Sequence, residues 1–225
     1  MIKLFKSSPF IFFVLMTPSV CLGEIKTLLT EPAGLLFEDD FSKNTLHSKF
    51  KVQQNTQWTI DSGVLVGKPA PKSYQASKPD HNGVAALISL ELPKQDVILK
   101  LDVKFDEKAL GGMVEFGHKV SKVSFNKKGI SLQGGKTKDT EKSKVEANKW
   151  YKMTGEVKGN EIVVSIDGVR VFYVKDDALR NNKKSIVLRG AKQGTIYFDN
   201  ISMYEAGDVI SKWEATKAKV LKDRS

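Results

Sequence analysis

The strongest indication of the fold lies in residues 150–171, which read WYKMTGEVKGNEIVVSIDGVRV. Two short turn signals, Gly159-Asn160 and Asp167-Gly168, divide this stretch into three β-rich runs. Two-residue links of this kind join neighbouring antiparallel strands, because their residues accept the positive φ angles of tight hairpins. The stretch therefore predicts three consecutive strands that pair as a meander.

A second β-rich run, GTIYFDNISMYEA at 194–206, is expected to close the sheet. Further β-rich runs separated by turn residues lie at 35–41, 50–53, 58–66, 84–92, 97–105, 113–118, 119–125, 129–133 and 185–190. About a dozen short strands favour an antiparallel sandwich over a parallel sheet, which would need crossover helices. The predicted fold class is all-β, a two-sheet jelly-roll sandwich with a short C-terminal helix.

The same patterns predict which side chains face the core. In the hairpin at 58–66 we take Asp61-Ser62-Gly63 as the turn. Alternation then gives four buried positions in that hairpin, namely Trp58, Ile60, Val64 and Val66. Trp150, which begins the run at 150–171, and Phe198, in the run at 194–206, are also expected to be largely buried.

Residues 1–23 have the composition of a secretory signal peptide. Lys3 and Lys6 precede an apolar run at 9–16, and small residues lead to Gly23. We expect cleavage after Gly23 and a secreted or periplasmic protein. Because Cys21 is the only cysteine, the mature chain would contain no disulfide.

Two other interpretations of this N-terminal segment stay open. The apolar run is too short for a membrane span, but a retained anchor helix is an alternative to cleavage. A bacterial lipoprotein would carry a small residue before the lipidated cysteine, whereas Val20 precedes Cys21. After cleavage we expect no membrane-spanning segment.

The chain is basic, with 36 Lys and Arg residues against 26 Asp and Glu residues and a formal charge of +10. Lysine supplies most of this charge and is scattered along the chain. No basic helix or RNA-binding aromatic motif accompanies the lysines, so we expect no nucleic-acid partner. The charge indicates either solubility and protection of sheet edges or attraction to acidic polysaccharides.

Two segments outside the predicted strands also invite an interpretation. The loop at 68–83 contains three prolines, and its exposed Tyr74 and His81 are either ligand contacts or part of a solvent loop.

Residues 207–225 predict an amphipathic helix with Asp208 as a possible N-cap. This helix would dock on the sandwich, or else serve as a free tail or partner helix.

The order of several short motifs resembles a known family. These motifs are the runs at 38–41, 58–67, 150–151, 166–168 and 197–201. Together they resemble the concanavalin A-like lectin/glucanase jelly roll, and most closely the secreted bacterial 3-keto-disaccharide hydrolase domains, which are family 16 glycoside hydrolase-like. The resemblance covers roughly residues 35–206, and we place the sandwich domain at 24–206.

The glucanase branch of this fold uses Glu-x-Asp-x-x-Glu on one strand, which sets two carboxylates about a glycosidic bond. The chain lacks this motif, and Glu115 is the nearest candidate, with no second carboxylate two or five residues on. Alternation puts Glu115 and His118 on opposite faces of their strand, unless His118 lies at its end. Glu115 is either a ligand-facing residue on the concave sheet or an exposed carboxylate paired with lysine, and His118 is a second candidate ligand residue.

Other chemistries find no matching residues. The mature chain has no cysteine and no Gly-x-Ser-x-Gly turn, so it indicates no nucleophile triad. It has no paired histidine or cysteine spacing for a zinc site and no glycine-rich loop for a nucleotide site. The resemblance does imply a structural calcium that joins the entering and closing segments, with Asp39 or Asp40 and Asp199 as ligands. Alternatively, Asp199 and Asn200 bond only to neighbouring backbone.

These features predict a secreted domain that binds or processes carbohydrate, with a polysaccharide or oligosaccharide partner that could be acidic. The main alternative is a non-catalytic envelope or matrix protein that uses the same fold for protein contacts. A true glycosidase is a third hypothesis. Exposed aromatic rings on the concave face would favour sugar binding, and lysines with small residues would favour the protein-contact alternative.

Overall fold

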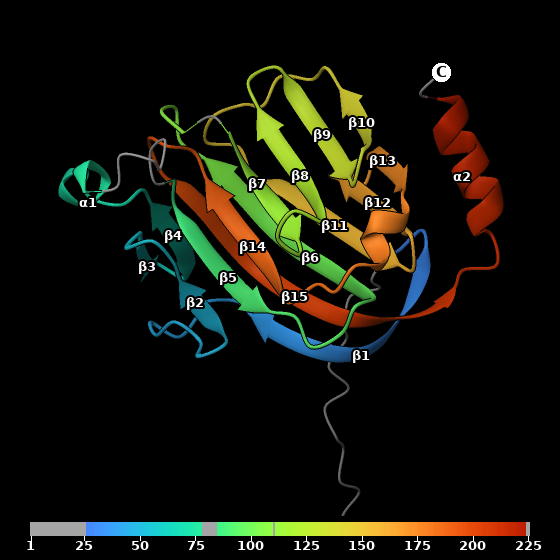
Figure 1. Ribbon diagram of the computed structural model, residues 1–225, viewed down its shortest axis with the longest axis horizontal. Helices are drawn as coiled ribbons and strands as arrows, with labels where there is room; N and C mark the ends of the chain where they lie inside the picture. The colour runs from blue at the N-terminus through green and yellow to red at the C-terminus, as the bar shows by residue number, and fades with distance from the viewer. Residues whose placement is uncertain (1–25, 78–84, 110, 224–225) are drawn as a thin grey trace, which may run out of the picture.

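The computed structural model describes residues 26–77, 85–109 and 111–223. Two antiparallel sheets pack face to face as a sandwich, with one helix beside it near the C-terminus (Figure 1). The strands are β1 (Thr30–Asp39), β2 (Phe50–Val52), β3 (Gln57–Asp61), β4 (Val64–Lys68), β5 (Leu87–Glu91), β6 (Val97–Phe105), β7 (Gly111–Phe116), β8 (Ser121–Asn126), β9 (Gly129–Gly134), β10 (Thr137–Glu141), β11 (Tyr151–Lys158), β12 (Glu161–Ile166), β13 (Arg170–Lys175), β14 (Ser185–Gly190) and β15 (Ile196–Val209). The helices are α1 (Lys72–Ala76), the 3-10 helix η1 (Asp177–Arg180) and α2 (Trp213–Lys222).

The eight-stranded sheet has the order β13-β12-β11-β6-β15-β4-β3, and β1 pairs with β15 beside this path. The seven-stranded sheet has the order β10-β9-β8-β7-β14-β5-β2. Non-consecutive neighbours such as β7 and β14 show that the chain crosses repeatedly between the sheets. The predicted all-β sandwich is confirmed, and its topology is that of a jelly roll.

The meander predicted from residues 150–171 is present as β11, β12 and β13. Gly159 has φ +58°, and Asp167 and Gly168 have φ +55° and +70°, so each predicted turn places at least one residue in the left-handed region. Val157 pairs with Ile162, and their side chains are fully buried. These local turn signals therefore place three neighbouring strands correctly.

The closing strand β15 extends beyond the predicted end at residue 206. Its backbone continues to pair with β1 as far as Val209, which lies opposite Thr30. Asp208 is consequently part of a strand, and the helix begins only at Trp213, preceded by Lys212 at the N-cap position. The prediction of a helix over 207–225 with Asp208 as its cap is wrong in these boundaries, because pairing with β1 overrides the local helical pattern.

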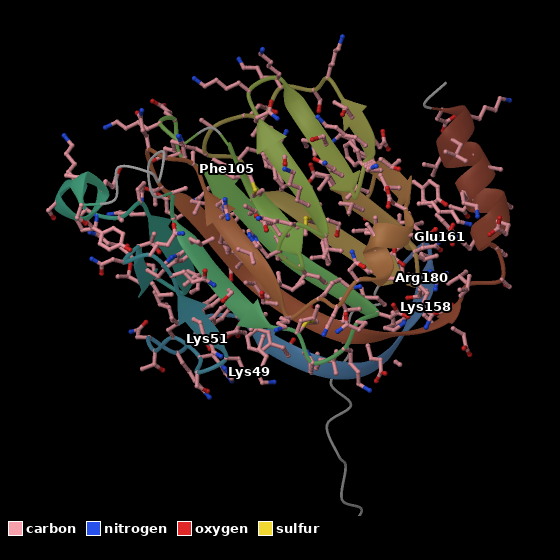
Figure 2. All side chains as sticks on the ribbon, in the orientation of Figure 1. Lys49, Lys51, Phe105, Lys158, Glu161 and Arg180 are labelled. Atoms are coloured by element: carbon pink, nitrogen blue, oxygen red, sulfur yellow. The ribbon has the colours of Figure 1, made fainter. Side chains whose placement is uncertain are left out.

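Helix α2 docks on the eight-stranded sheet through its first residue. Trp213 is 1% exposed and packs with Leu29 and Val163. One turn later, Lys217 Nζ lies 3.2 Å from a carboxylate oxygen of Glu161, which Figure 2 shows beside the helix. The predicted docking is thus confirmed.

The core between the sheets is rich in phenylalanine, and Phe105 and Phe198 are both fully buried. Trp150, in contrast, is only partly buried, so its predicted burial is wrong. Tyr151 takes the core position instead, at 1% exposure, because successive residues of a strand face opposite sides. Trp150 lies on the outer side, where Lys104 Nζ is 4.7 Å from its ring centre.

The β3–β4 hairpin differs from the prediction by one residue. Ser62 and Gly63 alone form the loop, with φ +51° and +75°, and Asp61 pairs directly with Val64. Ile60 therefore pairs with Leu65, which is fully buried in the core. We expected Val64 and Val66 on this face, but a two-residue loop shifts the alternation by one and turns both to the other side.

Candidate functional site

Glu115 lies on β7, the middle strand of the seven-stranded sheet. Its neighbours Val114 and Phe116 are buried in the core, so alternation directs Glu115 to the outer face of the sheet. The residue is nevertheless only 5% exposed. A charged side chain this enclosed on an outer face indicates a recess rather than a flat surface.

His118 lies against Glu115, because it is beyond the end of the strand, where the expected alternation of faces does not apply. Strand β7 ends at Phe116, and Gly117 adopts φ +77° at the start of a turn. The turn returns His118 to the side of Glu115, with His118 Nδ1 3.2 Å from Glu115 Oε2. This is the strand-end case that the sequence left open, because β7 ends at Phe116 and Gly117 begins the turn.

The glycine at position 117 is needed for this turn. A Cβ atom there would lie 2.7 Å from Lys183 Cγ and 3.2 Å from the Lys183 backbone, in addition to the strain of a positive φ. The turn also keeps a hydrogen bond from Val120 N–H to the Gly117 carbonyl at 3.1 Å. The close packing of Lys183 therefore helps to hold His118 beside Glu115.

Arg189 is the third member of the site and was not predicted. It lies on β14, adjacent to β7, and its Nη2 atom is 3.5 Å from Glu115 Oε1. Its Nε atom is buried, with no hydrogen-bond partner among the described residues. Sequence alternation along 185–190 would place Arg189 on an outer face, but only the sheet order brings it next to Glu115.

A row of outward-facing residues crosses the whole sheet at the level of Glu115. Paired positions on successive strands run in the order Lys51, Ser89, Val187, Glu115, Lys122, Gln133 and Lys138. We call this set the transverse row; Lys51 marks its β2 end in Figure 2. With strands about 4.8 Å apart, the row spans roughly 29 Å. It is thus long enough for an extended ligand of several units.

A hollow of about 340 Å³ opens at the β7–β9 part of this row. The residues that line it include Glu115, His118, Lys119, Lys122, Gln133 and Arg189. This volume falls within the range of small-molecule sites, about 300–1,000 Å³. Among the described residues, no Phe, Tyr or Trp side chain lines the hollow.

The Glu115–His118 contact limits the protonation states that can form it. An ionised carboxylate can only accept, so His118 must carry its proton on Nδ1 to donate to Glu115. In the neutral imidazole, Nε2 then holds a lone pair. The His118 side chain is 61% exposed and Glu115 is enclosed, so the pair has one anchored and one accessible member.

The predicted calcium ligands lie at a different place, at the junction of β1 and β15. Asp39 pairs with Ile201, which brings the entering and closing strands together as expected. Oδ1 of Asp39 accepts the Phe41 N–H at 2.9 Å, and Oδ1 of Asp199 accepts the Asn200 N–H at 2.7 Å. At least part of each carboxylate is therefore used in a local turn.

Several negative charges are close to one another at this junction. Burial raises the pKa of Asp199, and the charges of Asp102 and Asp40 raise it further, whereas the Asn200 N–H lowers it. Asp102 also accepts a hydrogen bond from Asn200 Nδ2 at 3.0 Å. Among the described residues, no three acidic or histidine side chains form a group that could hold a metal. These side chains alone do not complete a calcium shell, and calcium stays a prediction.

The proline-containing loop at 68–83 is only partly described. Tyr74 lies in the short helix α1 and is partly buried rather than exposed. His81 falls outside the described residues, as does the predicted signal peptide at 1–23. No helix of the described chain is both long and apolar enough to cross a membrane.

The sandwich and its recessed outer face define a jelly-roll domain of the concanavalin A-like type. Residues 18–203 match the sequence profile of the 3-keto-alpha-glucoside-1,2-lyase-like domain. Because this match spans most of the chain, the protein belongs to that family. A comparison with curated protein sequences gives no match.

Three similar solved structures are named as a sialidase, a carbohydrate-binding module and a glucanase. A sialidase is 14% identical with a TM-score of 0.58; the match covers 77% of this chain but only 19% of the sialidase. The carbohydrate-binding module CBM66 from Bacillus subtilis is 13% identical with a TM-score of 0.51, over 70% and 96% of the two chains. A family GH16 endo-β-1,3(4)-glucanase is 10% identical with a TM-score of 0.56, over 80% and 96%. At these identities the likeness shows the fold alone.

Proposed function

We propose that this protein is exported and binds an oligosaccharide along the transverse row, with the hollow at Glu115, His118 and Arg189 as the central subsite. The observation that supports the site best is an enclosed carboxylate on the middle strand, held by two other polar side chains. Carboxylate, guanidinium and amide groups match the alternating donors and acceptors of sugar hydroxyls. The family assignment and the carbohydrate-active structural relatives support the same ligand class.

The composition of the hollow bears on the alternative of a protein-contact domain. Phe, Tyr or Trp rings would have favoured sugar stacking, but the described lining contains none of them and includes Lys119 and Lys122. We therefore assign recognition to hydrogen bonds and charge rather than to stacking. An envelope or matrix protein that contacts other proteins through this face stays the alternative, and it predicts no glycan ligand.

The experiment is a glycan array probed with the mature chain from Glu24, with and without calcium. We expect a restricted set of oligosaccharides to bind wild-type protein and to be lost in Arg189→Gln, which removes the guanidinium beside Glu115 from the hollow. Lys127→Gln is the matched control, because Lys127 is an exposed residue in the β8–β9 turn. Equal binding by both variants would move the site elsewhere, and no bound glycan would favour the protein-contact alternative.

Processing of the bound sugar is a second candidate, favoured by the Glu115–His118 contact. A histidine oriented by a carboxylate can act as a general base. In a 3-keto glucoside the C2 proton is acidic because it is next to the carbonyl. Removal of that proton by His118 Nε2 would form the C1–C2 double bond and break the glycosidic C1–O bond, and the departing oxygen would take up a proton.

This elimination can be tested on a 3-keto disaccharide by measuring the sugar released. We expect His118→Ala to lower the rate by about 10²- to 10⁴-fold, the usual contribution of a general base. Glu115→Gln should lower the rate as well, because it weakens the orientation of the imidazole. Release that is unchanged in His118→Ala would exclude His118 as the base, and no release by wild-type protein would leave binding alone.

A further inference from the structure

We propose that the hollow accepts a sugar carrying an acid group, a carboxylate or a sulfate ester, and that Arg189, Lys122 and Lys119 hold that group. This inference rests on the proposed function and names the class of sugar. It goes beyond the family assignment, whose description refers to glucosides without an acid group.

The charges that line the hollow are unbalanced. Lys119, Lys122 and Arg189 are basic and Glu115 is the one acidic residue among the lining side chains, so three positive charges face one negative charge with His118 neutral. A recess with walls of low dielectric focuses the field of such charges and concentrates ligands of the opposite sign. The recess is therefore suited to an anion.

Glu115 offsets only one of these three positive charges, because its carboxylate contacts Arg189 and His118 but neither lysine. Oε2 lies 3.2 Å from His118 Nδ1 and Oε1 lies 3.5 Å from Arg189 Nη2. Lys122 stands opposite Glu115 on the neighbouring strand, yet neither Lys122 nor Lys119 forms an ion pair within the described part of the chain. Two ammonium groups are thus available to a ligand.

Arg189 also has unused hydrogen-bonding capacity. Its Nε–H is buried and finds no acceptor among the described residues. A buried donor without a partner is unfavourable, so an acceptor supplied by a ligand would stabilise the site. The guanidinium fork matches the paired oxygens of a carboxylate or sulfate in a way that a neutral hydroxyl does not.

The general basicity of the protein could by itself attract acidic sugars, so the test must separate local from global charge. Arg189→Gln and Lys122→Gln each remove one positive charge from the hollow. Lys127→Gln removes the same charge from the exposed β8–β9 turn, about which the proposal makes no claim. The three variants have equal net charge and differ only in the position from which the positive charge is removed.

The experiment is an NMR titration of the mature protein with three probes: methyl β-glucoside, methyl β-glucuronide and glucose 6-sulfate. We expect at least one acidic probe to bind about tenfold more tightly than the glucoside and to shift amides around Glu115 and Gln133. Arg189→Gln and Lys122→Gln should remove this preference, and Lys127→Gln should keep it. Raising the salt from about 50 to about 500 mM should reduce the preference, since charge attraction is screened.

The outcomes separate this inference from the proposed function. Equal binding of the glucoside and both acidic probes would overturn the acid-group proposal and leave sugar binding standing. A preference that falls equally in all three variants would also overturn it, because net charge would then be the cause. If glycans on the array bind but none of them is acidic, the proposal fails; if no glycan binds at all, both proposals fail.

Discussion

The carboxylate of Glu156 on β11 accepts the backbone N–H of Leu29 at 2.8 Å, across 127 residues of sequence. The same carboxylate accepts the N–H of Leu28 at 2.8 Å and of Thr30 at 3.0 Å. Leu29 in turn packs against Trp213, the first residue of α2. One buried acid therefore fixes the start of β1 and, through Leu29, the surface on which the C-terminal helix docks.

Replacing this acid should destabilise the protein. In Glu156→Ala the three N–H groups lose their acceptor, and we expect the free energy of unfolding to fall by about 3 kcal/mol. The measurement is urea unfolding of the mature chain. Glu146→Ala is the control, because Glu146 is exposed and pairs with Lys149 at the surface, where a change below about 1 kcal/mol is expected. Equal losses in both variants would contradict the assigned role of Glu156.

Phe198→Ala should be strongly destabilising. Phe198 is fully buried and stacks on Trp58 with ring centres 6.2 Å apart. Truncating a buried phenylalanine usually lowers the free energy of unfolding by about 3–5 kcal/mol. Trp150→Ala removes a larger ring from a partly buried position and should have the smaller effect. Thermal and urea unfolding of both variants would show the order, and the reverse order would place Trp150 in the core.

Docking of α2 should weaken in acid. Burial raises the pKa of Glu161, but hydrogen bonds from Tyr173 and Lys217 outweigh burial and bring the pKa below its usual 4.5. An acid whose pKa is lowered by folding stabilises the folded state above its unfolded pKa, and this contribution is lost as the pH falls through the folded value. The loss should therefore begin near pH 4.5 and continue below it.

Hydrogen exchange of the α2 amides, or Trp213 fluorescence, would follow this change between about pH 6 and pH 3. The Glu161→Gln variant should have a helix that is less protected at neutral pH and loses less protection in acid, because the titrating group is gone. The same acid sensitivity in Glu161→Gln and wild-type protein would attribute the effect to other groups.

Calcium is tested by thermal unfolding in EDTA and in millimolar calcium. A metal that binds only the native state stabilises it by about 2.7 kcal/mol at a hundredfold excess over Kd. We expect the wild-type midpoint to rise with calcium and the rise to be smaller in Asp199→Asn, which removes a charged ligand. A wild-type midpoint that is the same in both buffers would show that Asp39, Asp40 and Asp199 serve only their local turns.

Export predicts a defined N-terminus. Protein recovered from the periplasm or medium of a bacterial host should begin near Glu24 when sequenced, if the predicted signal peptide is removed after Gly23. A Gly23→Leu variant, which places a large residue at the cleavage position, should be processed slowly. An intact Met1 in the exported fraction would instead support the retained anchor helix.

The sequence by itself determined most of the strands and the tight turns, because these depend on neighbouring residues; β10 lies outside every predicted run. Gly159 and Asp167-Gly168 accept positive φ locally, so the β11–β13 meander could be read from the chain. The loop between β3 and β4 has two residues, Ser62 and Gly63, where the sequence predicted a turn of three. Val64 and Val66 were therefore assigned to the wrong face of the hairpin. The same reasoning found Glu115, and it left open whether His118 lies within the strand or beyond its end.

Only the tertiary structure decided what lies beside Glu115 and where the last strand ends. Arg189 is 74 positions away in sequence (189 minus 115) and becomes a neighbour solely because β14 pairs with β7. Likewise β15 runs to Val209 because β1 supplies hydrogen-bonding partners, and these outweigh the helical pattern of the tail. Pairing between distant strands depends on how the whole chain packs, and no local pattern around residue 115 or 207 contains that information.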